Sequence, residues 1–218
     1  MPSFEDYRKE MQRNLVLMSR TANGVVDTSA SPDKAGYMLI QSGDDAKKIV
    51  ARNVDRALEY VYAHRNDVFP DTEALRRFFL HIAEIVNAGV LAADHLMRSG
   101  LDSDIYKYVR VQFVPDVFAD FLVRILGKIN AVSYDAVEAA CFCEYAVNLT
   151  GHFFADGCGK CAMLTAAFAL MRADLHLPDY RSRDEYYRAM QNYPGSVGSD
   201  YIDEKTYSAF LAYYRTLF

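Results

Sequence analysis

Several features are scarce in this sequence, and each scarcity excludes a class of protein. The 218 residues include no tryptophan and only six prolines. Basic residues are fewer than acidic ones, and the formal net charge is −5. No apolar run is long enough to span a bilayer, and the first residues lack the apolar core of a signal peptide. Negative net charge argues against broad nucleic-acid binding, which usually needs a basic face. We therefore expect a cytoplasmic protein with no membrane or nucleic-acid partner, although delivery into another cell without a cleaved leader stays open.

Cysteine is also scarce, and the four residues fall in two close pairs, Cys141 with Cys143 and Cys158 with Cys161. Such spacing is compatible with zinc. The first pair, however, lies within a predicted helix, where residues two apart point about 200° away from each other. One ion is then not easily shared between them. No H-x-E motif precedes the pairs, which argues against a zinc deaminase. Buried free thiols are favoured over both zinc and a disulfide.

What the sequence does contain is helical periodicity and many aromatic residues, 16 Tyr and 13 Phe. Apolar residues recur at helical spacing along most of the chain. The predicted helices are 4–19, 44–65, 72 to about 98, 116–129, 133–148, 159–175, 183–191 and 205–217. Residues 106–113, YKYVRVQF, alternate enough to predict a short strand or hairpin arm. The fold class is therefore all-α, in one domain with a single small β-element.

The most informative segment is His152–Met163, HFFADGCGKCAM. A histidine can take a proton from a hydroxyl, and Asp156 can hold Mg²⁺. The backbone of Gly157–Gly159, at the start of an apolar helix, can donate N–H groups to a diphosphate. Each residue also has an ordinary interpretation: a structural histidine, a turn aspartate and loop glycines. The combination favours phosphate chemistry.

This segment resembles the Fic signature, H-x-F-x-(D/E)-G-N-G-R-x-x-R, of enzymes that transfer AMP or related groups to protein hydroxyls. The residues that match in register are His152, Phe154, Asp156, Gly157 and Gly159. Ala57–Tyr60, Tyr108–Val111 and Arg183–Tyr187 are similar to neighbouring parts of that family. The resemblance thus covers roughly residues 44–190, and only the central motif is specific.

The resemblance implies a Fic-like helical domain with a short β-hairpin flap and a role for each matching residue. His152 would be the general base, Phe154 an inward anchor, and Asp156 the ligand of Mg²⁺. The phosphates of ATP would lie on the backbone of Gly157, Cys158, Gly159 and Lys160. A target protein would add a strand to the flap at Val109, Arg110 and Val111. A homodimer is a further arrangement that the resemblance allows.

The chain departs from the signature at three positions. Cys158 replaces its asparagine, Lys160 its first arginine and Met163 its second arginine. Lysine keeps the charge without the bidentate fork, and methionine has no charge for the γ-phosphate. Cys158 is expected to lose an amide that would brace the phosphate-binding loop. These changes allow a different nucleotide pose, a different donor, or a site that only binds.

An inhibitory segment of the family, (S/T)-x-x-x-E-(G/N), has a degenerate counterpart at Ser19, Asn23 and Gly24, where asparagine replaces glutamate. An ordinary helix C-cap has the same composition. The predicted organisation is residues 1–43 as an N-terminal helix and loop with this segment, and residues 44–218 as the Fic-like domain.

The predicted function is that of a Mg²⁺-dependent protein adenylyltransferase, which moves AMP from ATP to a hydroxyl of a target protein. Two alternatives stay open. The first is a transferase of the same fold that moves phosphate, UMP or phosphocholine. The second is a non-catalytic binding module.

Overall fold

The computed structural model describes residues 1–18, 39, 44–99, 107–196 and 198–218. Within these ranges the regular elements are helices and helical turns, and Met97 and Phe154 form an isolated antiparallel bridge. The α-helices are α1 (Phe4–Met18), α2 (Asp44–Ala63), α3 (Thr72–Asn87), α4 (Val114–Ile129), α5 (Ala136–Glu144), α6 (Cys158–Met171), α7 (Arg183–Arg188) and α8 (Glu204–Arg215). The shorter turns are η3 (Ala93–His95), η4 (Val111–Phe113) and the π-helical η5 (Tyr145–Thr150). The all-α class is confirmed.

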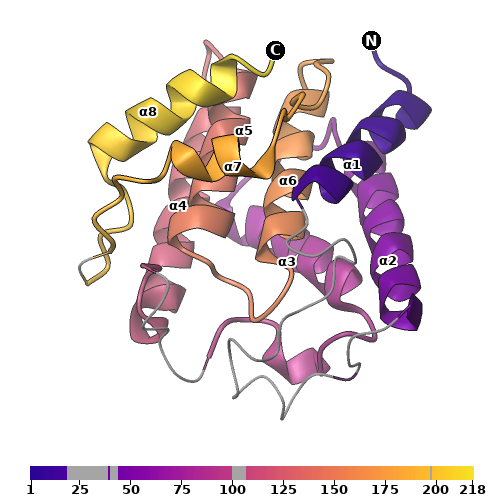
Figure 1. Cartoon of the computed structure of the whole chain (residues 1–218), viewed down its shortest axis with the longest axis horizontal. Coiled ribbons are helices and arrows are strands. Elements are labelled where there is room, and N and C mark those ends of the chain that lie inside the picture. The colour runs from indigo at the N-terminus through magenta and orange to yellow at the C-terminus, as the bar shows by residue number, and fades with distance from the viewer. Residues whose placement is uncertain (19–38, 40–43, 100–106, 197) are drawn as a thin grey trace.

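Helix α6 is the centre of the bundle (Figure 1). All of its residues except Gly159 and Lys160 are buried. A helix that is apolar on every side needs neighbours on every side, and α5, α2 and α3 supply them. The loop from η5 to α6 lies at the bottom of this view, while both chain ends lie at the top (Figure 1). The central motif therefore sits at one end of the most enclosed helix.

Side-chain caps fix where several helices begin. Asp71 accepts a hydrogen bond from the Ala74 N–H at 2.8 Å, as the sequence predicts for this helix start. Asp135, Ser182 and Asp203 cap α5, α7 and α8 in the same way. Each cap satisfies an N–H that the helix itself leaves without a partner.

Helix α1 shares the core of the rest of the chain. Tyr7 and Met11 are buried in the same hydrophobic cluster as α6. The Asn14 amide donates to the Pro178 carbonyl at 2.9 Å, and the Glu10 carboxylate accepts from the Leu177 N–H at 2.9 Å. The boundary at residue 43 stays a prediction, and α1 belongs to the packed core whichever way the chain is divided.

Two predicted elements are corrected. Helix α3 ends at Asn87 rather than near residue 98, because Gly89, with φ +72°, follows in a turn. The strand predicted at 106–113 is wrong for residues 107–113, which form irregular chain and the 3₁₀ turn η4. Pro115 in the first turn of α4 favours helix initiation there. The alternation arises because Val109 is buried in the core while Arg110 is exposed.

The four cysteines are buried free thiols, which confirms the prediction. Burial raises the pKa of the Cys141 and Cys161 thiols well above the usual value, so they are held as neutral thiols. None of the helices in the described ranges combines the length and the apolar character that crossing a membrane requires.

Candidate active site

His152 lies in the loop between η5 and α6 with a backbone φ of +48°. Left-handed backbone at a non-glycine residue costs about 1–3 kcal/mol and recurs at functional sites. The imidazole Nδ1 lies 3.0 Å from the carbonyl oxygen of Asn148. A carbonyl can only accept, so Nδ1 donates and the lone pair of the neutral ring is on Nε2. This tautomer is the one that a general base at Nε2 requires.

The imidazole is packed against an aromatic ring from another part of the chain. Tyr108 is stacked on His152, with ring centroids 3.9 Å apart. The Arg98 guanidinium lies 5.9 Å from the Tyr108 centroid and donates to the carbonyls of Val109 and Gly151. Arg98 thus fastens the residue after Tyr108 to the residue before His152. In the sequence Tyr108 appeared only as part of the flap-like segment, and no motif spacing connects either Tyr108 or Arg98 to the histidine.

Gly157 forms the cap of α6 with a backbone φ of +70°. A Cβ at this position would lie 3.1 Å from Val86 Cγ1 and 3.4 Å from Asn87 Oδ1. The Asn87 amide donates to the Asp156 carbonyl at 3.4 Å and so supports the turn from α3. Both the backbone conformation and the close approach of α3 therefore require glycine here. The turn presents the first N–H groups of α6, the kind of site that binds anions.

Cys158 braces the loop that precedes it. Its thiol accepts from the Phe154 N–H at 3.3 Å and donates to the Phe154 carbonyl at 3.1 Å. The side-chain amide of the signature is absent, as expected, and the sulfur instead makes two hydrogen bonds to the Phe154 backbone. Phe154 is buried and packs edge-on near Phe118, with ring centroids 6.2 Å apart. The loop is thus held by a core aromatic and by a thiol.

The remaining motif residues differ in their exposure to solvent. Asp156, Gly159 and Lys160 are half-buried, whereas Met163 is 9 % exposed and packs in the core. A Cβ at Gly159 would lie 3.5 Å from Asn148 Oδ1, so the Asn148 amide covers that glycine. Asn148 therefore contacts both the imidazole of His152 and the first turn of α6. In the sequence, only the position of Asn148 one helical turn before His152 could have indicated these contacts.

The motif residues provide some of the groups that would bind a nucleotide with its Mg²⁺, and lack others. The described residues contain no cluster of three side chains that would hold a metal ion on its own. A Mg²⁺ bound with phosphates needs only one or two protein carboxylates, and Asp156, next to the α6 N-terminus, could supply one. Lys160 adds a positive charge there. With Met163 in the place of an arginine, these residues fit a diphosphate better than a complete triphosphate.

The segment matched to the flap does not form an accessible strand. Val109 is buried, its N–H donates to the Thr150 carbonyl at 2.9 Å, and its carbonyl accepts from Arg98. Strand addition needs unpaired backbone groups, so Val109 cannot receive a target strand in this structure. Target binding at Arg110 and Val111 stays a prediction. The Ser19, Asn23 and Gly24 segment lies outside the described residues.

A buried carboxylate lies behind the site. Glu144 is 1 % exposed and accepts hydrogen bonds from the hydroxyls of Tyr180, Tyr186 and Tyr214. Burial raises the pKa of Glu144 to about 7, and the three hydroxyls oppose part of that rise. The Tyr186 oxygen also accepts from the Asn148 amide at 3.3 Å. Tyr186 is therefore part of a buried hydrogen-bond network that includes Glu144 and Asn148.

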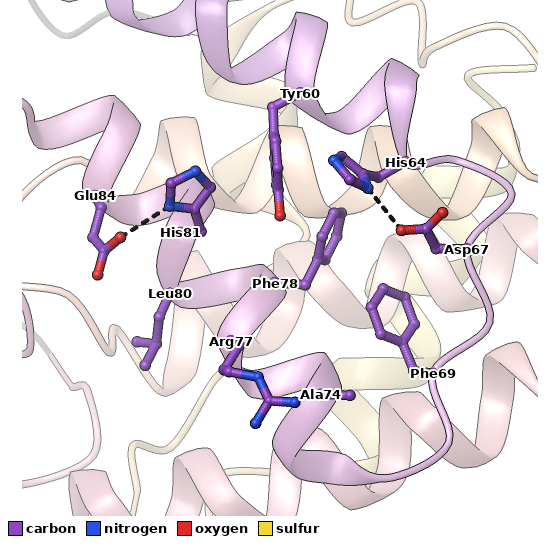
Figure 2. A pocket seen from close by; sticks show the side chains of 10 residues that line it. All are labelled: Tyr60, His64, Asp67, Phe69, Ala74, Arg77, Phe78, Leu80, His81 and Glu84. Carbon is purple, nitrogen blue, oxygen red and sulfur yellow. Dashed lines mark hydrogen bonds and ion pairs between the residues drawn. The ribbon is translucent and has the colours of Figure 1, made fainter.

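A separate surface pocket of about 450 Å³ lies over α2 and α3 and shares no residue with the motif (Figure 2). Tyr60 stands between two imidazoles, with centroid distances of 4.4 Å to His64 and 4.7 Å to His81. His64 Nδ1 contacts Asp67 at 2.7 Å, and His81 Nδ1 contacts Glu84 at 3.0 Å. Each imidazole is paired with its own neighbour, on opposite sides of the tyrosine (Figure 2). The two histidines do not converge on one ligand position.

Comparison with known proteins identifies the fold. No family model matches the sequence, and no curated protein matches it. A Fic domain containing signaling protein from Bacteroides thetaiotaomicron aligns with a TM-score of 0.66 at 14 % identity, over 98 % of this chain and 83 % of that one. Fic-1 from C. elegans aligns with a TM-score of 0.63 at 18 % identity over all of this chain. A Fic family protein from Desulfovibrio desulfuricans aligns with a TM-score of 0.56 at 17 % identity over 98 % of this chain. The chain spans 64 % and 63 % of those two proteins. The protein has the Fic fold.

Proposed function

We propose that this protein is a Mg²⁺-dependent protein adenylyltransferase that transfers AMP from ATP to a hydroxyl side chain of a target protein. The observation that carries the proposal is the hydrogen bond from His152 Nδ1 to the Asn148 carbonyl, which puts the ring lone pair on Nε2. Asn148 also covers Gly159 in the first turn of α6. Asn148 therefore contacts both the proposed base and the helix N-terminus that is proposed to bind phosphate, in a protein with the Fic fold.

In the proposed step His152 Nε2 takes the proton of the acceptor hydroxyl. The hydroxyl oxygen forms a bond to the α-phosphorus, and the bond from that phosphorus to the bridging oxygen breaks. Pyrophosphate leaves with the electron pair, and His152 later returns its proton to solvent. Asp156 would hold Mg²⁺, which neutralises the charge of the phosphates. The first-turn amides of α6 and Lys160 would bind the leaving diphosphate.

A second candidate is a transferase of the same fold that moves another group, namely phosphate, UMP or phosphocholine. The apolar, nearly buried Met163 favours it, because no arginine is present there for the third phosphate. A binding module without catalysis is the remaining alternative, which Cys158, Lys160 and Met163 together favour.

The proposal is tested with ATP labelled at the α- or the γ-phosphorus and lysate proteins as acceptors. The α-label should be transferred to protein hydroxyls, and His152→Ala should lower transfer by roughly 10²–10⁴-fold. His81→Ala is the matched control, because His81 is half-exposed on α3 in the separate pocket. Circular dichroism should show an equally folded protein for both variants.

The outcomes separate the candidates. Transfer of the γ-label alone would mean phosphate transfer, and transfer from a UTP or CDP-choline panel without transfer from ATP would mean another donor. Calorimetry with ATP and Mg²⁺ that finds no binding up to millimolar concentration, together with no transfer from any donor, would leave the binding module and overturn the proposal.

Met163→Arg tests the nucleotide pose directly. An arginine one turn beyond Gly159 restores a charge that can reach a third phosphate. If ATP binds in the pose that the resemblance implies, this variant should bind ATP more tightly and ADP with unchanged affinity. Met163→Gln, of similar length and without charge, is the control. Equal effects of the two variants on ATP affinity would contradict the pose.

A further inference from the structure

The segment between Glu144 and His152 is a π-helix, Tyr145–Thr150, that continues α5. The Gly151 N–H donates to the Ala146 carbonyl at 2.9 Å, and the Thr150 hydroxyl donates to the Tyr145 carbonyl at 3.1 Å. Such segments are rare and occur mainly at functional sites, since the wider turn re-aims backbone groups. Here the wider turn brings the Asn148 carbonyl to the imidazole of His152.

The side chain of Asn148 makes a second contact, with Tyr186. Its amide donates to the hydroxyl oxygen of Tyr186 at 3.3 Å, and the Tyr186 hydroxyl donates to Glu144 Oε2 at 2.9 Å. In its charged form, above its pKa, the buried carboxylate can only accept, so it then sets the direction of both bonds. The Tyr186 proton points to Glu144, which leaves the Tyr186 oxygen to accept from Asn148. The chain of donors therefore runs from Asn148 through Tyr186 to Glu144.

We propose that Tyr186 is a positioning residue for His152: with Glu144 it anchors Asn148, whose carbonyl then holds the imidazole in the Nδ1–H tautomer. The link cannot pass a proton, because it enters His152 through a backbone carbonyl. It acts by orientation alone. Its consequence for turnover rests on the proposed adenylyl transfer, whereas its consequence for the tautomer of His152 does not.

Tyr214 provides a matched comparison within the same cluster. Its hydroxyl donates to Glu144 Oε1 at 3.1 Å, as that of Tyr186 donates to Oε2, but the contacts of Asn148 do not include Tyr214. Tyr186→Phe and Tyr214→Phe each remove one buried hydroxyl from the same carboxylate. Both should lower stability to a similar extent. Only Tyr186→Phe should affect His152.

The experiment records long-range proton–nitrogen NMR spectra of the histidine-labelled full chain at alkaline pH, with His152 assigned from the His152→Asn spectrum. The wild type and Tyr214→Phe should show His152 protonated at Nδ1. Tyr186→Phe should show a mixture of the two tautomers. Asn148→Ala removes the same link without touching Glu144, and it should give the same mixture if Tyr186→Phe does not fold.

Activity gives the second measurement. Tyr186→Phe should lower kcat roughly tenfold to a hundredfold, the size expected for a misplaced catalytic group, with the KM for ATP unchanged. Tyr214→Phe should retain the wild-type kcat. An unchanged His152 tautomer in both Tyr186→Phe and Asn148→Ala would overturn the positioning role. Absence of transfer by the wild type would overturn the proposed function instead, while the tautomer measurement would still decide the role of Tyr186.

Discussion

The phenol ring of Tyr108 lies parallel to the imidazole of His152, with 5° between the two planes and 3.9 Å between the centroids. One face of the imidazole is thus covered by the phenol ring. Stacked aromatic pairs contribute about 0.5–1.5 kcal/mol beyond the area that they bury. This stack joins the chain before α4 to the loop before α6.

Removal of the Tyr108 ring should therefore loosen His152. We expect Tyr108→Ala to increase the rate at which diethyl pyrocarbonate modifies His152, and to lower transfer activity, each by roughly threefold to tenfold. Tyr108→Phe keeps the ring and should behave like the wild type in both assays. Mass spectrometry of the peptide containing His152 measures the first effect. A wild-type modification rate in the alanine variant would contradict this prediction.

The two motif glycines should respond to alanine in opposite ways. Gly157→Ala places a Cβ on left-handed backbone, 3.1 Å from Val86 Cγ1, and should lower the free energy of unfolding by about 1–2 kcal/mol. Gly159 is helical and has ordinary space for a methyl group, so Gly159→Ala should be neutral or stabilising by up to about 1 kcal/mol. Urea denaturation measures both.

Gly159→Ala also tests the phosphate site separately from the fold. A methyl group there restricts Asn148 and the approach to the first-turn amides. If a diphosphate binds at these amides, we expect ATP affinity to fall about tenfold, which is roughly 1.4 kcal/mol. Calorimetry that finds an unchanged affinity in a stable Gly159→Ala protein would show that the phosphates do not approach this glycine.

Glu144 should make stability depend on pH. The pKa of this carboxyl rises from 4.5 to about 7 on folding, because burial disfavours the charged form. The folded state therefore holds a proton that the unfolded state releases, so the contribution of Glu144 to stability is largest below pH 4.5 and declines as the pH rises to about 7. Glu144→Gln removes this titration. Relative to the wild type it should gain roughly 3 kcal/mol between pH 4 and pH 8. Parallel stability curves for the two proteins would contradict the raised pKa.

Cys158 should contribute more to stability than its volume explains. Cys158→Ala leaves the buried Phe154 N–H without its sulfur acceptor, whereas Cys161→Ala removes the same volume from a buried position of the same helix. We expect the first variant to be about 1 kcal/mol less stable than the second. Thermal denaturation compares the two. Equal midpoints would mean that the thiol contacts add nothing beyond packing.

The helices were predictable from sequence because their signals are local. Apolar spacing and the Asp71 cap define α3, and the run after Gly157 defines α6. The strand at 106–113 was mispredicted because alternation there comes from tertiary burial of Val109, with its N–H bonded to Thr150. Short alternating segments carry too few residues to separate a strand from irregular chain with one buried side.

The motif residues could be predicted from the sequence, whereas the contacts that position them could not. His152 and Asp156 are recognisable by type and spacing. Tyr108, Arg98 and Tyr186 reach the site from distant parts of the chain, and only the fold brings them together. The hydrogen bonds of Cys158 to the Phe154 backbone could not be predicted from the sequence, because they depend on how the loop folds back on the first turn of α6.

The burial of α6 has a consequence for hydrogen exchange. An enclosed core helix opens only when the whole protein unfolds, so the amides from Cys161 to Met171 should be among the slowest to exchange. The loop at 151–157, with strained backbone at His152, can open at a lower free energy. Heat or denaturant should therefore disorder the His152 imidazole before α6 unfolds, and the proposed transfer activity should be lost before the helical signal.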